Sequence, residues 1–235
     1  MTRGKTLARI HRVRTLQLGL TRADEARAHD KFASEQLLSG RIALLVEAVA
    51  AAQAERRRIR IWCAGCSTGQ EPLSLAMAFA ERHQTSGAPM PEIVATDVSE
   101  AALVRARAGR FSQFEIQRGL PVRQMIRWFD TTGSDWVAKP ELVKLVSFRR
   151  MNLVSDQPPP GRFDIILCRN VLLYLSTQTK THVFPKLADA LNPGGMLVLG
   201  AGETVIGQTK AFEPSKAFRG FYQLQGEEGR SQAVG

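Results

Sequence analysis

The chain has 235 residues, a hydrophobic content of 44% and a formal net charge of +10 at pH 7. This length and composition predict one substantial core with room for a small appendage. No apolar run approaches the roughly 18–20 residues of a membrane-spanning helix, and no signal peptide is recognised, so we expect a cytoplasmic protein that is not inserted in a membrane. Three cysteines exclude a disulfide framework.

The positive charge is concentrated in the first quarter of the chain. Residues 1–60 contain 13 Lys and Arg against 6 Asp and Glu. Such a segment can attract an acidic protein surface, nucleic acid or anionic lipid, or it can simply be a solvated surface. The arginines do not distinguish among these alternatives. We predict that residues 1–57 form a basic, mostly helical N-terminal region. The apolar residues at helical spacing are Leu37, Leu38, Ile42, Leu45, Val46 and Val49.

From residue 59 onward, patterns typical of strands alternate with helical patterns. Strands are predicted at 59–62, 92–97, 143–149, 163–168, 196–199 and 221–224. Helices are predicted over 71–83, over 100–108 with Ser99 as N-cap, and from about Ser176 with a kink or break near Pro185. A turn is expected at 192–195. The alternation predicts an α/β fold with a doubly wound, mostly parallel sheet.

Residues 109–142 interrupt this alternation. They contain Arg-Gly-Leu-Pro at 118–121, the pair Trp128-Phe129 and a region rich in turn residues near 131–135. We therefore expect a small inserted subdomain within a larger domain that spans 58–225. The tail 226–235 is expected to be disordered.

Residues 59–79 predict the first half of a nucleotide-binding βαβ unit. Their strand is followed by seven small residues, Cys63–Gly69, and then by Glu71 and Pro72 at the start of a helix. Small residues let a ligand lie directly on the backbone, and a helix N-terminus offers unpaired N–H donors. The carboxylate of Glu71 would repel a pyrophosphate but suits a cationic ligand. S-adenosyl-L-methionine has sulfonium and ammonium groups, so the loop favours methyl transfer.

Further short motifs follow in a fixed order: Trp62–Pro72, Ala95–Asp97, Asn152-Leu153, Cys168–Tyr174 and Pro193–Gly195. In these motifs the chain resembles the CheR-type chemoreceptor glutamate methyltransferases over roughly residues 58–224. The resemblance implies a class I, Rossmann-like methyltransferase fold and S-adenosylmethionine as cofactor, with S-adenosylhomocysteine as product. It also implies that the substrate is glutamate on the cytoplasmic helical domain of a chemoreceptor, in chemotaxis signalling. We expect the protein to act as a monomer.

The resemblance implies a set of cofactor contacts at the matching positions: Ala64, Gly65, Glu71, Asp97, Asn152, Leu153, Asn170, Val171 and Tyr174. Asp97 ends a predicted strand, where an acid can accept hydrogen bonds from both ribose hydroxyls. The alternative is that it caps the following helix. The amide of Asn152 can bind the adenine edge, although this asparagine can equally be an ordinary turn residue.

Arg169 and Tyr174 are the candidate catalytic residues. A guanidinium can orient a substrate carboxylate bidentately, or Arg169 can be a structural salt-bridge partner. Tyr174 can alternatively be a core aromatic with a satisfied hydroxyl. A glutamate side chain, with a pKa of about 4.3, is already ionised at neutral pH, so alignment matters more than a general base. The histidines lie outside the loop motifs: His11, His29, His83 and His182.

Other functions have weaker support. Cys63 and Cys66 suggest a metal or redox site, but zinc needs about four ligands and no second pair has suitable spacing, so no metal is expected. The family usually carries an Asn-Glu-Thr-x-Phe-Phe-Arg type motif upstream, whereas the corresponding region here is His29–Ser34. This difference keeps open a cofactor-binding interaction module without catalysis. The charge keeps open a nucleic-acid methyltransferase, although no recognition module is evident and we expect no stable nucleic-acid binding.

Overall fold

A computed structural model describes residues 58–117, 120–216 and 220–226 of the chain. Its strands are β1 (Arg60–Ala64), β2 (Glu92–Asp97), β3 (Arg110–Ser112), β4 (Phe129–Thr132), β5 (Asp135–Ala138), β6 (Val146–Arg150), β7 (Phe163–Cys168), β8 (Leu191–Leu199), β9 (Phe212–Pro214) and β10 (Phe221–Leu224). The predicted N-terminal region 1–57 and nearly all of the predicted tail 226–235 lie outside the described residues.

Six α-helices and one short 3₁₀-helix are found in the described part of the chain. They are α4 (Gln70–Ser86), α5 (Glu100–Ala108), α6 (Gln113–Gln117), α7 (Val122–Trp128), α8 (Pro140–Val143), η3 (Leu172–Tyr174) and α9 (Thr177–Asp189). Within the described ranges, every helix is too short or too polar to cross a bilayer.

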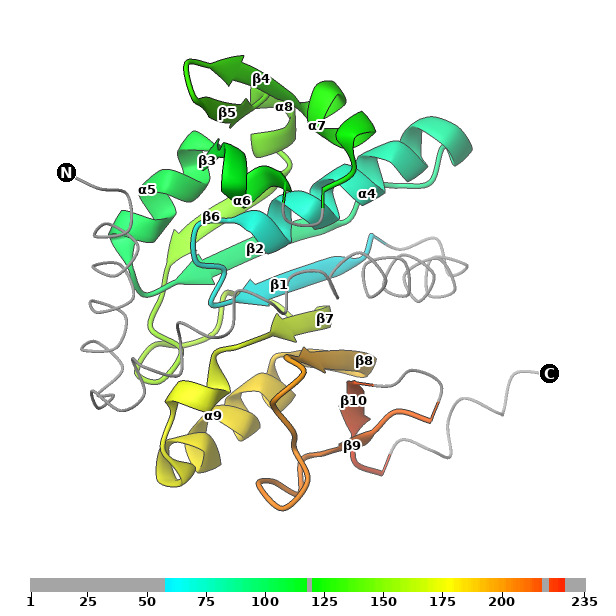
Figure 1. The fold of residues 1–235 in the computed structure, drawn as a ribbon. Helices are drawn as coiled ribbons and strands as arrows, with labels where there is room; N and C mark the ends of the chain where they lie inside the picture. Colours follow the sequence, from blue (N-terminus) through cyan, green and yellow to red (C-terminus); the bar gives the residue numbers. More distant parts are fainter. Residues whose placement is uncertain (1–57, 118–119, 217–219, 227–235) are drawn as a thin grey trace.

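The strands form two sheets. The larger has the order β6-β2-β1-β7-β8-β10-β9, and β6, β2, β1, β7 and β8 are parallel to their neighbours in this series. β10 is antiparallel to both β8 and β9. The smaller sheet, β3-β5-β4, is formed by the connection between α5 and β6, and Figure 1 shows it at the opposite end of the molecule from β9 and β10.

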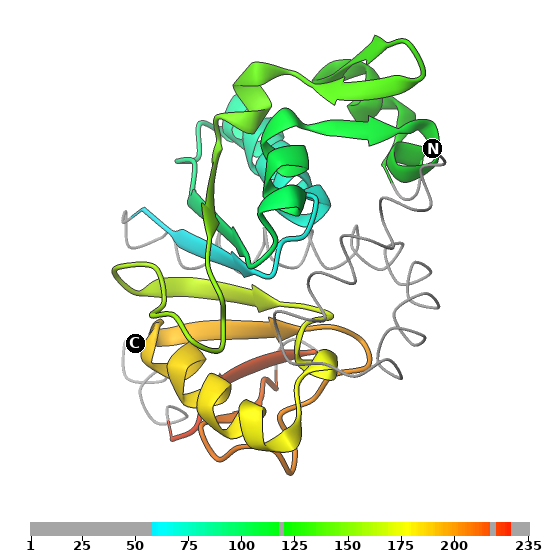
Figure 2. The same cartoon turned by 90° about the vertical axis from the view of Figure 1, so that its left-hand side faces the viewer.

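Helices cover both faces of the large sheet. In β1, Ile61 and Cys63 belong to a hydrophobic cluster with α4, whereas Trp62 and Ala64 belong to a second cluster with α9. All four are at most 2% exposed. Because successive strand residues point to opposite faces, a central strand with helices on both sides must be apolar throughout. Figure 2 shows α9 alongside β8, at a distance from α4. The predicted doubly wound α/β fold is confirmed.

Several predicted elements have the predicted bounds. β2, β7, β10 and α5 begin and end where the sequence indicates, and the Ser99 side chain accepts a hydrogen bond from Ala102 N at 3.3 Å as the N-cap of α5. β1 and α4 are longer than predicted. β6 starts later, at Val146, because residues 140–143 form α8.

Three features differ from the sequence prediction. α9 continues through Pro185 to Asp189, so the helix is not broken there. The predicted turn at 192–195 is an irregularity within β8: five residue steps from Leu191 to Met196 are opposed by two steps of β7. The additional residues bulge out of the ladder, which Pro and two Gly accommodate. The short strand β9 was not predicted.

Candidate cofactor-binding site

The predicted site residues lie at one edge of the large sheet. Ala64 is the last residue of β1 and Asp97 the last of β2, Asn152 follows β6, and Arg169 and Asn170 follow β7. The strand order reverses between β1 and β7, which are hydrogen-bonded neighbours. In open α/β sheets, ligands bind outside the carboxyl ends of the strands at this reversal. The fold therefore gathers residues from four separate connections at the expected place.

The loop after β1 donates its backbone N–H groups to the neighbouring strand. Gly65 N and Cys66 N both donate to Thr96 O, at 2.8 and 2.9 Å. Ser67 N donates to Asp97 Oδ2 at 2.8 Å. Gly65 has a φ of 82°, a left-handed conformation that glycine adopts without strain. Because these donors already have protein acceptors, they do not form a cradle for phosphate.

Asp97 connects the loop to helix α5. Its side chain is buried at 2% exposure, with Oδ2 bound to Ser67 N and Oδ1 accepting from Ser99 N at 2.9 Å. Ser99 is the N-cap of α5, and Asp97 binds the N–H of this residue without itself capping the helix; it also makes a loop contact that the sequence did not indicate. A carboxylate can accept about four hydrogen bonds, so both contacts are compatible with bonds to a ligand. Ribose binding by Asp97 remains a prediction.

Glu71 and Arg169 form an ion pair across the reversal of strand order. Arg169 Nη1 lies 2.7 Å from Glu71 Oε2, and the side chains are 9% and 17% exposed. The structural salt-bridge alternative for Arg169 is therefore present. Arg169 Nε is buried without a hydrogen-bond acceptor in the described ranges. A buried donor without a partner is unusual in a native protein, and a ligand carboxylate would satisfy it.

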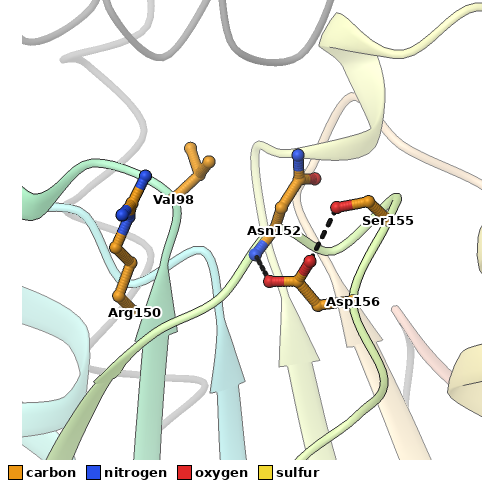
Figure 3. Close-up of a pocket in the computed structure, with 5 residues that line it drawn as sticks. All are labelled: Val98, Arg150, Asn152, Ser155 and Asp156. Carbon is orange, nitrogen blue, oxygen red and sulfur yellow. Dashed lines mark hydrogen bonds between the residues drawn. The ribbon is translucent and has the colours of Figure 1, made fainter.

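A cavity of about 490 Å³ opens beside Asp97, between the ends of β2 and β6. Figure 3 shows Val98 and Arg150 on one side and Asn152, Ser155 and Asp156 on the other. Asn152 Oδ1 accepts from Val154 N at 2.9 Å, so its side chain forms a local turn as well as lining the cavity. Asn152 N donates to Asp156 Oδ2 at 2.8 Å, and this bond is the main cause of the lowered pKa of Asp156.

The remaining predicted contacts have buried side chains. Leu153, Val171 and Tyr174 are 7%, 2% and 7% exposed. Leu153 and Val171 belong to the hydrophobic cluster with α9, and Tyr174 ends η3.

Glu203 was missed by the sequence interpretation. Its carboxylate accepts four backbone hydrogen bonds, from Asn170, Val171, Leu173 and Gly200. The only sequence signal is an acid directly after a Gly-Ala-Gly stretch that follows a strand. The partners lie up to 33 residues away, so no local pattern identifies them.

The three cysteines are packed inside the protein. Cys63, Cys66 and Cys168 are all buried free thiols. Burial raises the pKa of Cys63, and the nearby Glu71 raises it further, so its reactive thiolate form is disfavoured. Within the described ranges, no group of three His, Cys, Asp or Glu side chains is arranged to hold a metal ion.

Comparison with known proteins identifies the family. Residues 34–221 match the family model of the CheR methyltransferase, SAM binding domain. The chain belongs to this CheR family. It is 40% identical over 153 residues to chemotaxis protein methyltransferase 1 of Pseudomonas aeruginosa, covering 63% of this chain and 56% of that protein. It is 41% identical over 163 residues to the chemotaxis protein methyltransferase of Vibrio parahaemolyticus, covering 68% and 59%.

The chain thus spans little more than half the length of these curated relatives. Among solved structures, magnesium protoporphyrin IX methyltransferase from Synechocystis PCC 6803 has 18% identity and a TM-score of 0.42, over 72% of this chain and 55% of that one. S-adenosylmethionine is the cofactor of this CheR domain. The site fits its chemistry, because the carboxylate of Glu71 and the acceptor-free Nε of Arg169 complement a ligand that carries both positive charge and a carboxylate.

Proposed function

We propose that this chain is a protein-glutamate O-methyltransferase that forms methyl esters on the cytoplasmic helical domain of a chemoreceptor, in chemotaxis signalling. The observation that carries the proposal is the gathering of Asp97, Asn152 and the Glu71–Arg169 pair around one edge of the sheet, beside a cavity. The names of the curated relatives support a role in chemotaxis.

Each proposed cofactor contact has a chemical reason. Asp97 binds the ribose hydroxyls, and Asn152 binds the adenine edge from the wall of the cavity. Glu71 binds the cationic methionine end through Oε1, to which no described residue donates a hydrogen bond, while Oε2 is held by Arg169. Ala64, Gly65, Leu153, Asn170 and Val171 complete the walls.

The reaction asks little of the protein beyond alignment. When bound, S-adenosylmethionine supplies a methyl group on a sulfonium, and S-adenosylhomocysteine is the product. The substrate glutamate is already anionic at neutral pH, so the protein needs no base to activate it. We propose that Arg169 orients the substrate carboxylate with its guanidinium, and that Tyr174 helps to close the site against water.

A two-step measurement tests the proposed function. Isothermal titration with S-adenosylmethionine measures cofactor binding, and transfer of tritiated methyl groups to receptor membranes measures catalysis. Base-labile label is expected, because methyl esters hydrolyse in base. Cofactor binding without base-labile label would reject catalysis and favour an interaction module, and label on RNA or DNA would favour a nucleic-acid methyltransferase.

Asp97→Ala tests the assignment of the site. We expect cofactor binding to weaken by about 1–3 kcal/mol, the scale of losing charge-assisted hydrogen bonds. Asp164→Ala is the matched control: Asp164 is also buried and accepts from Arg60 N at 2.8 Å, but it lies near the amino end of β7. Wild-type affinity in folded Asp97→Ala, or an equal loss in both variants, would reject the ribose assignment.

A further inference from the structure

The Glu203 carboxylate has all of its acceptor positions occupied by the protein backbone. Oε2 accepts from Asn170 N and Gly200 N, each at 2.7 Å. Oε1 accepts from Val171 N at 2.9 Å and Leu173 N at 3.2 Å. A carboxylate has about four acceptor positions, so the group is saturated. It therefore joins the connection after β7 to the connection after β8.

The segment that Glu203 holds has an uncommon backbone conformation. Asn170 has a φ of 55°, in the left-handed region that residues other than glycine seldom adopt. Asparagine tolerates this region better than most residues, but such a conformation persists only where the surroundings fix it. The N–H of Asn170 itself donates to Glu203, so the carboxylate holds this residue directly.

Gly200 allows the close approach of the two connections. A Cβ at this position would collide with Asn170 Oδ1 and would lie 2.7 Å from Glu203 Oε2. The end of β8, the carboxylate and the Asn170 side chain are thus packed with no space for another atom. This packing is independent support for a rigid unit formed by Glu203, Gly200 and Asn170.

We infer that Glu203 is a positioning residue for the cofactor site: it sets the backbone of Asn170–Leu173 in the conformation that binds S-adenosylmethionine. The inference rests on the proposed function, because Asn170 and Val171 are its proposed cofactor contacts. Arg169 immediately precedes this segment and pairs with Glu71, so the anchor also fixes one end of that ion pair. Glu203 itself does not touch the reacting atoms, because its acceptor positions are occupied.

Glu203→Gln in the full chain tests the inference. Glutamine has the same shape but replaces one acceptor oxygen by an NH₂ donor, so two backbone N–H groups lose their acceptor. We expect the amides of Asn170, Val171, Leu173 and Gly200 to exchange with deuterium about 10-fold faster or more. The KM for S-adenosylmethionine should rise about 10-fold, while kcat at saturating cofactor changes less than about threefold.

The control is Glu213→Gln, which removes the same charge from β9, where Glu213 accepts from Gln223 Nε2 at 3.0 Å. This variant should keep wild-type exchange at the four amides and wild-type KM. Glu203→Asp keeps the charge and should lie between wild type and Glu203→Gln in both measurements. It also provides the comparison if Glu203→Gln does not fold.

The exchange measurement needs no cofactor, so it separates the inference from the proposed function. Wild-type protection of the four amides in Glu203→Gln would overturn the anchor. Faster exchange with an unchanged KM would overturn the positioning role. A wild-type chain that binds cofactor but methylates no receptor would reject the proposed catalysis and leave the anchor supported by its exchange rates and by the cofactor dissociation constant.

Discussion

Two loops at the same edge of the sheet are held by opposite charges. The connection after β7 is held by the Glu203 carboxylate, which accepts from four backbone N–H groups. The connection after β6 is held by the Lys186 ammonium of α9, which donates to the carbonyls of Leu153, Val154 and Asp156 at 3.3, 2.6 and 2.9 Å. Each charged group uses every hydrogen-bonding position that it has.

The comparison indicates how a parallel sheet supports irregular loops around a ligand. Backbone groups beyond a strand end have lost their ladder partners and need others. The Glu203 carboxylate accepts hydrogen bonds from N–H groups on one side of the site, and the Lys186 ammonium donates to carbonyls on the other. The two anchors differ in reach: Glu203 joins two connections, whereas Lys186 joins one connection to a helix. We therefore expect substitutions around Glu203 to lower the unfolding free energy more than substitution of Lys186.

Gly200→Ala should give the largest effect, because it pushes apart the unit around Glu203. The new Cβ has no space between Asn170 and the carboxylate, and overpacking of this kind costs about 2–3 kcal/mol of unfolding free energy. Urea denaturation measures the loss. Gly207→Ala is the control: a Cβ there meets nothing within 4 Å, so only the left-handed φ of 72° costs about 1 kcal/mol. Equal losses in the two variants would mean that the unit is not tightly packed.

Lys186→Met should give a smaller effect on the other loop. Methionine keeps the apolar stem but removes the three donors, and water can reach the freed carbonyls where they are exposed. We expect a loss of about 1–2 kcal/mol in unfolding free energy. Lys180→Met on the same helix is the control, because the Lys180 side chain makes no hydrogen bond in the described part of the chain. A loss in Lys186→Met as large as that in Gly200→Ala would remove the difference between the two anchors.

The sequence predicts the position of the site better than it predicts what holds the site. Asp97 ends a strand, and Asn152 and Asn170 each follow one. The carboxyl ends of parallel strands meet at one edge, so strand prediction alone places the three residues together. The Glu71–Arg169 pair was one of two alternatives for Arg169, because a cation after a strand has no preferred partner in sequence. Its partner lies 98 residues away.

The anchors themselves leave no pattern in the sequence. Glu203 and Lys186 bind backbone groups, and every residue offers the same backbone groups, so residue type gives no sign of the contact. The bulge in β8 was missed for a related reason. Asn-Pro-Gly-Gly has the composition of a turn, but the pairing of Leu191 and Met196 with β7 decides that the strand continues.

The smallest effect is expected from Asp156, which lies in the loop that Lys186 holds. The N–H of Asn152 and the hydroxyl of Ser155 bind its carboxylate and lower its pKa. The ionised form therefore stabilises the folded loop. This contribution is complete above the ordinary aspartate pKa of about 3.9 and is lost as the pH falls through the lower pKa of the folded state.

Asp156→Asn cannot ionise and should have a lower melting temperature than the wild type at pH 7. The difference should stay constant down to about pH 5 and shrink towards pH 3, where the wild-type carboxyl also becomes protonated. Thermal unfolding of both proteins across this range measures it. A difference that does not change with pH would mean that the side chain acts by shape and not by charge. In that case Lys186 alone would supply the electrostatic part of this anchor, and the contrast with the single carboxylate of Glu203 would become sharper.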